Sequence, residues 1–138
     1  MIYIDSNVFI YAALSLDSED NAKFSKDILK SIFDGQIMAA TSTLTWDEVV
    51  WTIKRLAGPE TALDEGQKFL EFPKIKFLKV GEKELRSALR LMKEYNIDPR
   101  DSIHAACCIE NNIKEIITND SDFYKIGEIH VIPLNKIA

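Results

Sequence analysis

Five acidic residues stand where a chain could build a charged site. Asp5 follows the apolar start MIYI, Glu48 lies in TLTWDEVVWTI, Asp101 lies in DPRDSIHAA, and Asp120 and Asp122 lie in IITNDSDF. Carboxylates within a few ångströms of one another cannot all stay ionised unless a cation binds or some of them become protonated. Sites made of carboxylate oxygens suit Mg²⁺ or Mn²⁺, and such ions can make a water molecule nucleophilic near neutral pH. If these acids meet, the residue types therefore favour metal-assisted hydrolysis of a phosphodiester.

Each acid also has a simpler explanation. Asp5 could cap a helix that begins directly after it. The sequence DPRD has the form of a capped helix start, and the two acids of NDSD fit a polar turn. Glu48 beside Asp47 could be an ordinary exposed pair on a helix. The interpretation depends on whether the fold brings the acids together.

The hydrophobic pattern predicts strands that alternate with helices. Short apolar runs predict strands at Met1–Ile4, Ile37–Thr41, Ile75–Val80, Glu115–Thr118 and His130–Pro133. Helical spacing, with Gly and Pro as breakers, predicts helices at Ser6–Leu14, Glu19–Phe33, Thr43–Leu56, Glu60–Phe72, from Gly81 to Tyr95, and from Pro99 to Glu110. This order is typical of a three-layer α/β fold with a mostly parallel sheet, in which ligands bind at the carboxyl ends of the strands. If the first and fourth strands are neighbours, Asp5 and Asp120 lie side by side there.

Length and composition limit the classes of protein that fit. The chain has 138 residues, which suits a single domain, and no apolar run approaches the roughly 18 residues of a membrane span. We find no signal peptide pattern and expect a cytoplasmic protein. The net charge of −5 argues against a general nucleic-acid coat protein, but not against a nuclease. Cys107 and Cys108 are adjacent, match no zinc spacing with the two histidines, and are interpreted as reduced, buried thiols.

Four stretches in order resemble the PIN-domain family, and within it the small VapC-like toxin ribonucleases. They are YIDSNVFIY, TSTLTWDEVVWTI, DPRDSIHAACCIENNI and IITNDSDF, and they cover the chain nearly end to end. The resemblance implies a Rossmann-like α/β/α fold and a single PIN-like domain over residues 1–138. It also implies dependence on Mg²⁺ or Mn²⁺, cleavage of RNA, a homodimer, and a neutralising antitoxin as partner.

The resemblance also implies residue roles. Metal-binding and catalytic acids would be Asp5, Glu48 rather than Asp47, Asp101 and Asp120, with Asp122 a further ligand directly or through water. Asn7 and Thr118 resemble the polar residues that hold carboxylates or water in place. Ser6 stands where the family more often has Thr.

The acidic overall charge is less expected for an RNA enzyme, but residues 74–100 contain eight Lys or Arg and four acids, a local net charge of +4. Lys83, Arg86, Arg90 and Lys93 share one helical face and could bind RNA, although a solvated surface is the simpler interpretation. Arg100, next to Asp101, is the stronger candidate.

Two tryptophans and one histidine in the same stretches each have two possible roles. Trp46 and Trp51 could stack on bases, but packing is the simpler interpretation. His104 lies one helical turn after Asp101 and could face the site, but it is most simply a structural histidine.

Two other functions fit parts of the sequence. One is a catalytically silent PIN-fold module for protein interaction, which the presence of all the principal acids disfavours. The other is an aspartate-nucleophile phosphatase with Asp5 as the nucleophile, which would prefer an acid where Asn7 stands. The chain has no Gly-rich phosphate loop, so an NTPase is poorly supported.

Overall fold

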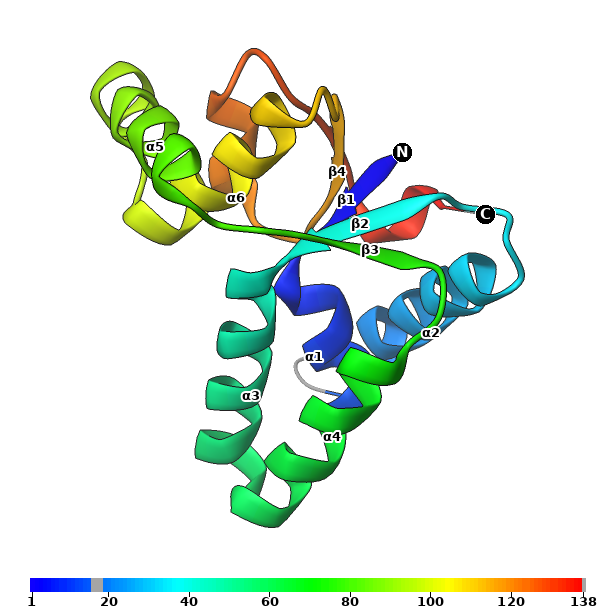
Figure 1. Ribbon diagram of the computed structural model, residues 1–138. Coiled ribbons are helices and arrows are strands. Elements are labelled where there is room, and N and C mark those ends of the chain that lie inside the picture. Colours follow the sequence, from blue (N-terminus) through cyan, green and yellow to red (C-terminus); the bar gives the residue numbers. More distant parts are fainter. Residues whose placement is uncertain (16–18, 138) are drawn as a thin grey trace.

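A parallel sheet lies at the centre of the computed structural model, which describes residues 1–15 and 19–137 (Figure 1). Its strands are β1 (Ile2–Ile4), β2 (Ala39–Ser42), β3 (Ile75–Leu78), β4 (Glu115–Ile117) and β5 (His130–Ile132). They lie in the order β3-β2-β1-β4-β5, and all four neighbouring pairs are parallel. The predicted α/β fold is confirmed, and the sheet is parallel throughout rather than mostly parallel.

The helices follow the predicted positions within one or two residues. They are α1 (Ser6–Leu14), α2 (Glu19–Phe33), α3 (Thr43–Ala57), α4 (Pro59–Glu71), α5 (Glu82–Tyr95) and α6 (Pro99–Glu110), with short 3₁₀ helices η1 (Ser121–Lys125) and η2 (Leu134–Lys136). The turn predicted at 119–122 runs directly into η1, because the Asp120 side chain accepts a hydrogen bond from the backbone N of Asp122 and starts a helical turn. None of the helices in the described part of the chain is long and apolar enough to cross a membrane.

Two hydrophobic clusters, one on each face of the sheet, make the three layers. On one face α5, α6 and η1 pack on Tyr3 and Ile116 of the sheet. On the other face α1 to α4 pack on Ile4 and Ile117. The alternation of Tyr3 and Ile4 between the faces follows from the two-residue period of a strand. The sheet is therefore covered on both sides, as a parallel sheet requires.

The edge at which the strands end is where the acids gather. β1 lies between β2 and β4, with Tyr3 paired to Ile116 and Ile4 to Ile117. The residues that follow the two strands, Asp5 and Thr118, therefore emerge side by side. The chain adds β2 and β3 on one side of β1 and then β4 and β5 on the other, so the strand order reverses between β1 and β4. Such a switch point is where α/β proteins place ligands.

Candidate metal and catalytic site

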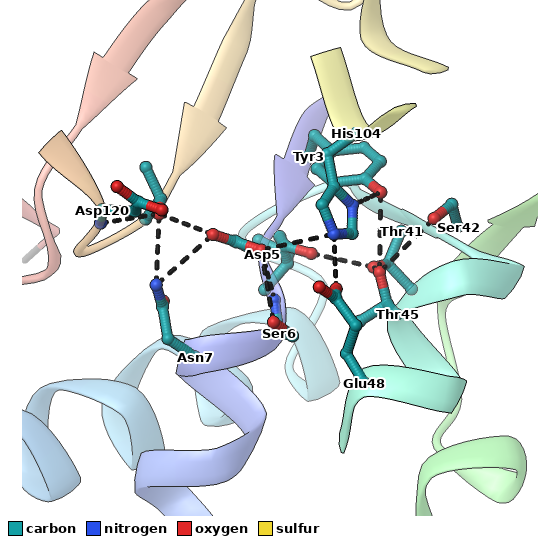
Figure 2. Close-up of polar contacts among 12 residues, drawn as sticks. Tyr3, Asp5, Ser6, Asn7, Thr41, Ser42, Thr45, Glu48, His104 and Asp120 are labelled. Atoms are coloured by element: carbon teal, nitrogen blue, oxygen red, sulfur yellow. Dashed lines mark hydrogen bonds and ion pairs between the residues drawn. The ribbon is translucent and has the colours of Figure 1, made fainter. Parts of the chain in front are cut away.

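Asp5 is buried at the end of β1 and caps α1. Its Oδ1 accepts a hydrogen bond of 2.7 Å from the backbone N of Ser6, and its side chain is almost fully enclosed. Its Oδ2 accepts from Thr118 Oγ1 at 2.7 Å and from Asn7 Nδ2 at 3.3 Å (Figure 2). The simpler interpretation of Asp5 as a helix cap is correct, and the same side chain also lies among the other acids.

Thr118 connects the acid of β1 to the loop after β4. Besides donating to Asp5, its Oγ1 accepts hydrogen bonds from Asn7 Nδ2 at 3.2 Å and from the backbone N of Asp120 at 3.0 Å. Asn7 Oδ1 in turn accepts from the backbone N of Asn119. Thr118 and Asn7 thus link Asp5 to the Asp120 loop through hydrogen bonds.

Glu48 projects from α3 toward His104 of α6. The Glu48 Oε1 atom lies 2.5 Å from His104 Nε2, and Asp5 Oδ1 lies 3.8 Å from the same nitrogen. The other ring nitrogen, Nδ1, lies 2.6 Å from the hydroxyl of Tyr3 (Figure 2). Asp47, the acid beside Glu48, is exposed on α3.

An open cleft of about 520 Å³ runs past these residues. It is lined by Glu48, Asp98, Pro99, Arg100, Asp101, Asp120 and Asp122. Its walls come from the second turn of α3, the start of α6 and the loop after β4. Four of the five predicted acids line this cleft, and the fifth, Asp5, lies close enough to Asp101 for its charge to act on it.

The electrostatics of Asp101 reflect how closely the acids gather. Burial raises the pKa of Asp101, and the charges of Asp120, Asp5 and Asp122 raise it further, to about 7. Burial also raises the pKa of Asp5, despite the nearby imidazole of His104 and the hydrogen bond from Thr118. The site therefore holds more negative charge than its hydrogen bonds balance.

The pKa of His104 is raised as well. Burial acts to lower it, but the hydrogen bond with Glu48 and the charges of Asp5, Glu48 and Asp101 outweigh that effect. An imidazolium at this position would offset part of the carboxylate charge.

Two groups of side chains could each hold a metal ion. In each group the ligand atoms lie within 4.8 Å of one another: Asp5, Glu48 and His104 form the first, and Asp98, Asp101 and Asp122 form the second. Oxygen-rich groups of this kind fit hard divalent cations. Asp120 belongs to neither group, and its Oδ1 accepts a hydrogen bond from the backbone N of Asp122.

The basic residues fall into two classes. Lys83, Arg86 and Arg90 on α5 form ion pairs with Glu110, with Glu82, and with Glu94 and Glu128, respectively. Arg100 is exposed at the mouth of the cleft and has no ion pair with any residue that the structure describes. Only Arg100 among the predicted substrate-binding residues lines the cleft.

Trp46 of α3 contacts α4, whereas Trp51 is exposed on the surface of α3. The indole Nε1 of Trp46 donates to the backbone O of Gly66 on α4, and the guanidinium of Arg55 lies 5.1 Å from the centroid of the Trp51 ring. The packing interpretation of Trp46 is therefore correct.

Three residues at the site were not predicted to belong to it. The sequence leaves the role of His104 open, with a structural histidine as the simpler interpretation, and it predicts Asp98 only as part of a helix start and Tyr3 only as part of a strand. The side chain of Asp98 makes no capping hydrogen bond and lines the cleft instead. A signal for His104 is its spacing of three from Asp101, which places the two side chains on one helical face. A buried tyrosine in a strand also needs a hydrogen-bond partner, which is the available signal for Tyr3.

Comparison with known protein families gives a match over most of the chain. Residues 2–129 match the family model of the PIN domain. No significant match is found among curated proteins.

Solved structures share the fold at low sequence identity. VapC20 of Mycobacterium tuberculosis, described as a sarcin-ricin loop cleaving toxin, has a TM-score of 0.76 at 14% identity, over 92% of this chain and 95% of that one. VapBC2 of Rickettsia felis bound to a promoter DNA fragment has a TM-score of 0.74 at 18% identity, over 96% and 98%. A toxin-antitoxin complex from Klebsiella pneumoniae has a TM-score of 0.70 at 18% identity, over 99% and 100%.

Proposed function

The chain belongs to the PIN domain family, and from this premise we propose that it is a metal-dependent endoribonuclease that hydrolyses RNA phosphodiester bonds. The observation that carries the proposal is the cleft that brings Glu48, Asp101, Asp120 and Asp122 together beside the buried Asp5. Burial, together with the charges of the neighbouring acids, raises the pKa of Asp101 to about 7, in keeping with this geometry. Carboxylates gathered so closely are best balanced by a divalent cation.

The residues that would hold Mg²⁺ or Mn²⁺ are Asp5, Glu48, Asp101, Asp120 and Asp122. A bound cation would lower the pKa of a coordinated water and offset charge on the phosphate. Thr118 and Asn7 hold the Asp5 carboxylate through hydrogen bonds of 2.7 and 3.3 Å. Arg100, exposed beside Asp101, would bind a phosphate of the RNA through its guanidinium.

A toxin of a VapBC-type pair is the biological setting that we propose. Structures with this fold include toxin-antitoxin complexes from Klebsiella pneumoniae and Rickettsia felis, which supports an antitoxin as partner. The α3–α4 pair exposes four large apolar side chains, Trp51, Leu56, Leu63 and Leu70, and such exposure supports assembly as a homodimer. The two free, buried thiols are typical of a reducing compartment, which supports a cytoplasmic protein. We infer that residues 1–138 act as one PIN-like domain.

RNA cleavage tests the enzymatic proposal directly. The purified protein is incubated with tRNA, rRNA and mRNA in Mg²⁺ or Mn²⁺, with and without EDTA. We expect cleavage only with metal, and we expect Asp5→Asn and Glu48→Gln to abolish it. Asp47→Asn is the matched control, because Asp47 is adjacent in sequence but exposed away from the cleft, and it should cleave normally. Cleavage that continues in EDTA would refute the metal-dependent mechanism.

The toxin proposal needs a separate experiment. The product of the neighbouring reading frame is co-expressed with the protein, and the purified material is analysed by size-exclusion chromatography with light scattering. We expect a stable complex that no longer cleaves RNA, and a dimer for the protein alone. A neighbour that neither binds nor inhibits would contradict the pairing, without bearing on the cleavage itself.

A further inference from the structure

We infer that His104 is a positioning residue: its ring, held by Tyr3, fixes the Glu48 carboxylate next to Asp5 and so preforms the metal-binding side of the cleft. This inference rests on the proposed metal binding. The proposed function assigns roles to five acids and none to His104.

The contacts of the imidazole fix its orientation. The side chain is only 1% exposed, and both of its nitrogens are engaged, Nδ1 by the Tyr3 hydroxyl at 2.6 Å and Nε2 by Glu48 at 2.5 Å. The Tyr3 and His104 rings meet edge to face, with centroids 5.6 Å apart. A rotated ring would lose both hydrogen bonds in a buried place, where unpaired polar groups are costly.

The direction of these hydrogen bonds presents a donor to Glu48. When the Tyr3 hydroxyl donates to Nδ1, the ring proton is at Nε2, and a doubly protonated ring carries a proton there as well. His104 therefore donates through Nε2 to Glu48 Oε1. No other partner of the Glu48 carboxylate is found among residues 1–15 and 19–137, so its second oxygen remains for a ligand in the cleft.

Tyr3 is itself anchored beneath the site. Its hydroxyl lies 3.5 Å from Thr45 Oγ1, and Thr45 Oγ1 lies 2.8 Å from Thr41 Oγ1, which donates to the backbone O of Ile4. This buried chain of polar groups joins β1, β2, α3 and α6 (Figure 2). Since Glu48 lies on α3 and His104 on α6, the chain connects the elements whose relative position sets the Glu48–Asp5 distance.

Metal titration of three variants tests the inference without reference to RNA. His104→Leu removes the donor, His104→Gln returns an N–H near the position of Nε2, and Tyr3→Phe removes only the hydroxyl that fixes the ring. Tyr95→Phe is the matched control, because the Tyr95 hydroxyl bonds Glu128 before β5, outside the site. Binding of Mg²⁺ and Mn²⁺ is measured by calorimetry, and folding by circular dichroism.

We expect His104→Leu to lower the affinity for both ions about 10- to 100-fold, because loss of a group that supports a metal ligand has an effect of this size. His104→Gln should recover most of this affinity, Tyr3→Phe should lose less than His104→Leu, and Tyr95→Phe should bind as wild type. A folded His104→Leu that binds both ions normally would overturn the inference. A loss for Mn²⁺ but not Mg²⁺ would also overturn it, because His104 would then be a nitrogen ligand of the metal.

Proton NMR of the metal-free protein separates this inference from the proposed function. We expect a downfield, slowly exchanging imidazole N–H signal that disappears in His104→Leu and shifts in Glu48→Gln. Absence of the signal in the wild-type protein would overturn the positioning role even if RNA is cleaved. If the signal is present but the wild-type protein binds neither ion, the proposed metal-dependent function fails and the positioning role for metal fails with it.

Discussion

Asp5 illustrates how one residue serves both the fold and the site. Its Oδ1 caps α1, while its Oδ2 is held by Thr118 and Asn7. Its position could be predicted from the sequence, because an acid directly after a buried strand must emerge at the sheet edge. The contacts of His104 with Glu48 and Tyr3 could not be predicted, because these residues lie 56 and 101 positions from His104 in the sequence. Only the packed fold brings them together.

The raised pKa of Asp101 predicts that ionisation of this residue destabilises the metal-free protein. The folded-state pKa of about 7 lies above the ordinary value of 3.8, so the folded state binds the proton more tightly and loses stability as pH rises through this range. Asp101→Asn removes the charge. It should raise the free energy of unfolding at pH 8 by about 1–2 kcal/mol, allowing for solvent screening of a half-buried group, and by less at pH 5.

Urea unfolding of the metal-free protein at the two pH values measures this effect. Asp47→Asn, which is adjacent to Glu48 in sequence but exposed outside the cleft, serves as the control and should change little at either pH. An Asp101→Asn protein that is no more stable than wild type at pH 8 would contradict the crowding of charge described above.

Thr118→Val should damage the site while leaving the fold intact. The hydroxyl is buried, donates to Asp5, and accepts from Asn7 Nδ2 and from the backbone N of Asp120. Valine of similar shape therefore leaves three polar groups without this partner. Loss of such a hydrogen bond costs about 1–3 kcal/mol. We expect that loss in the free energy of unfolding, together with weaker Mn²⁺ binding in calorimetry. Thr52→Val, partly exposed on α3, should change neither quantity.

At the scale of elements, α3 and α4 form a closely packed pair beside the site. The carbonyl of Gly66 accepts a hydrogen bond from Trp46, and a Cβ at position 66 would lie 2.9 Å from Cγ2 of Val50. The helices themselves could be predicted from apolar spacing and from the Gly58–Pro59 break. The need for glycine at position 66 could not, because it depends on how closely the two helices approach.

Gly66→Ala should therefore destabilise the protein by about 1–3 kcal/mol, the usual cost of forcing an extra carbon into packed helices. Gly127→Ala is the matched control, since its nearest neighbour would be the Tyr95 hydroxyl at 3.9 Å. Thermal unfolding followed by circular dichroism compares the two variants. Equal melting temperatures for Gly66→Ala and wild type would show that the helix pair can separate slightly at little cost.

At the scale of the whole molecule, net charge does not report where RNA would bind. The chain carries −5 overall, yet the arginine at the mouth of the cleft has no acidic partner in the described part of the chain, whereas Lys83, Arg86 and Arg90 are paired. The parallel sheet and its ligand edge could be predicted from the alternating pattern. The pairs of Arg86 with Glu82 and of Arg90 with Glu94 could be read from their spacing of four on α5. The pairs with Glu110 and Glu128 could not, because these acids come from other parts of the fold.

The salt dependence of RNA binding should separate these basic residues. Each phosphate contact contributes about 0.7 to the slope of log K against log salt for single strands. Arg100→Gln should lower the slope by about that amount, whereas Arg86→Gln should leave it nearly unchanged. Binding of a cleavage-inactive Asp5→Asn protein to labelled RNA across a salt series gives both slopes. An equal reduction for both variants would mean that the RNA also lies along α5.

The position of the helix starts gives the cleft a further electrostatic property. Asp5 precedes α1, Asp101 lies in the first turn of α6, and Glu48 lies in the second turn of α3. The amino-terminal ends of these three helices therefore lie next to the acids of the site. Aligned peptide dipoles give each such end about half a positive charge. The backbone therefore supplies a positive potential of its own under the carboxylates. Once cations occupy those carboxylates, this potential would draw a polyanion into the cleft of an acidic protein.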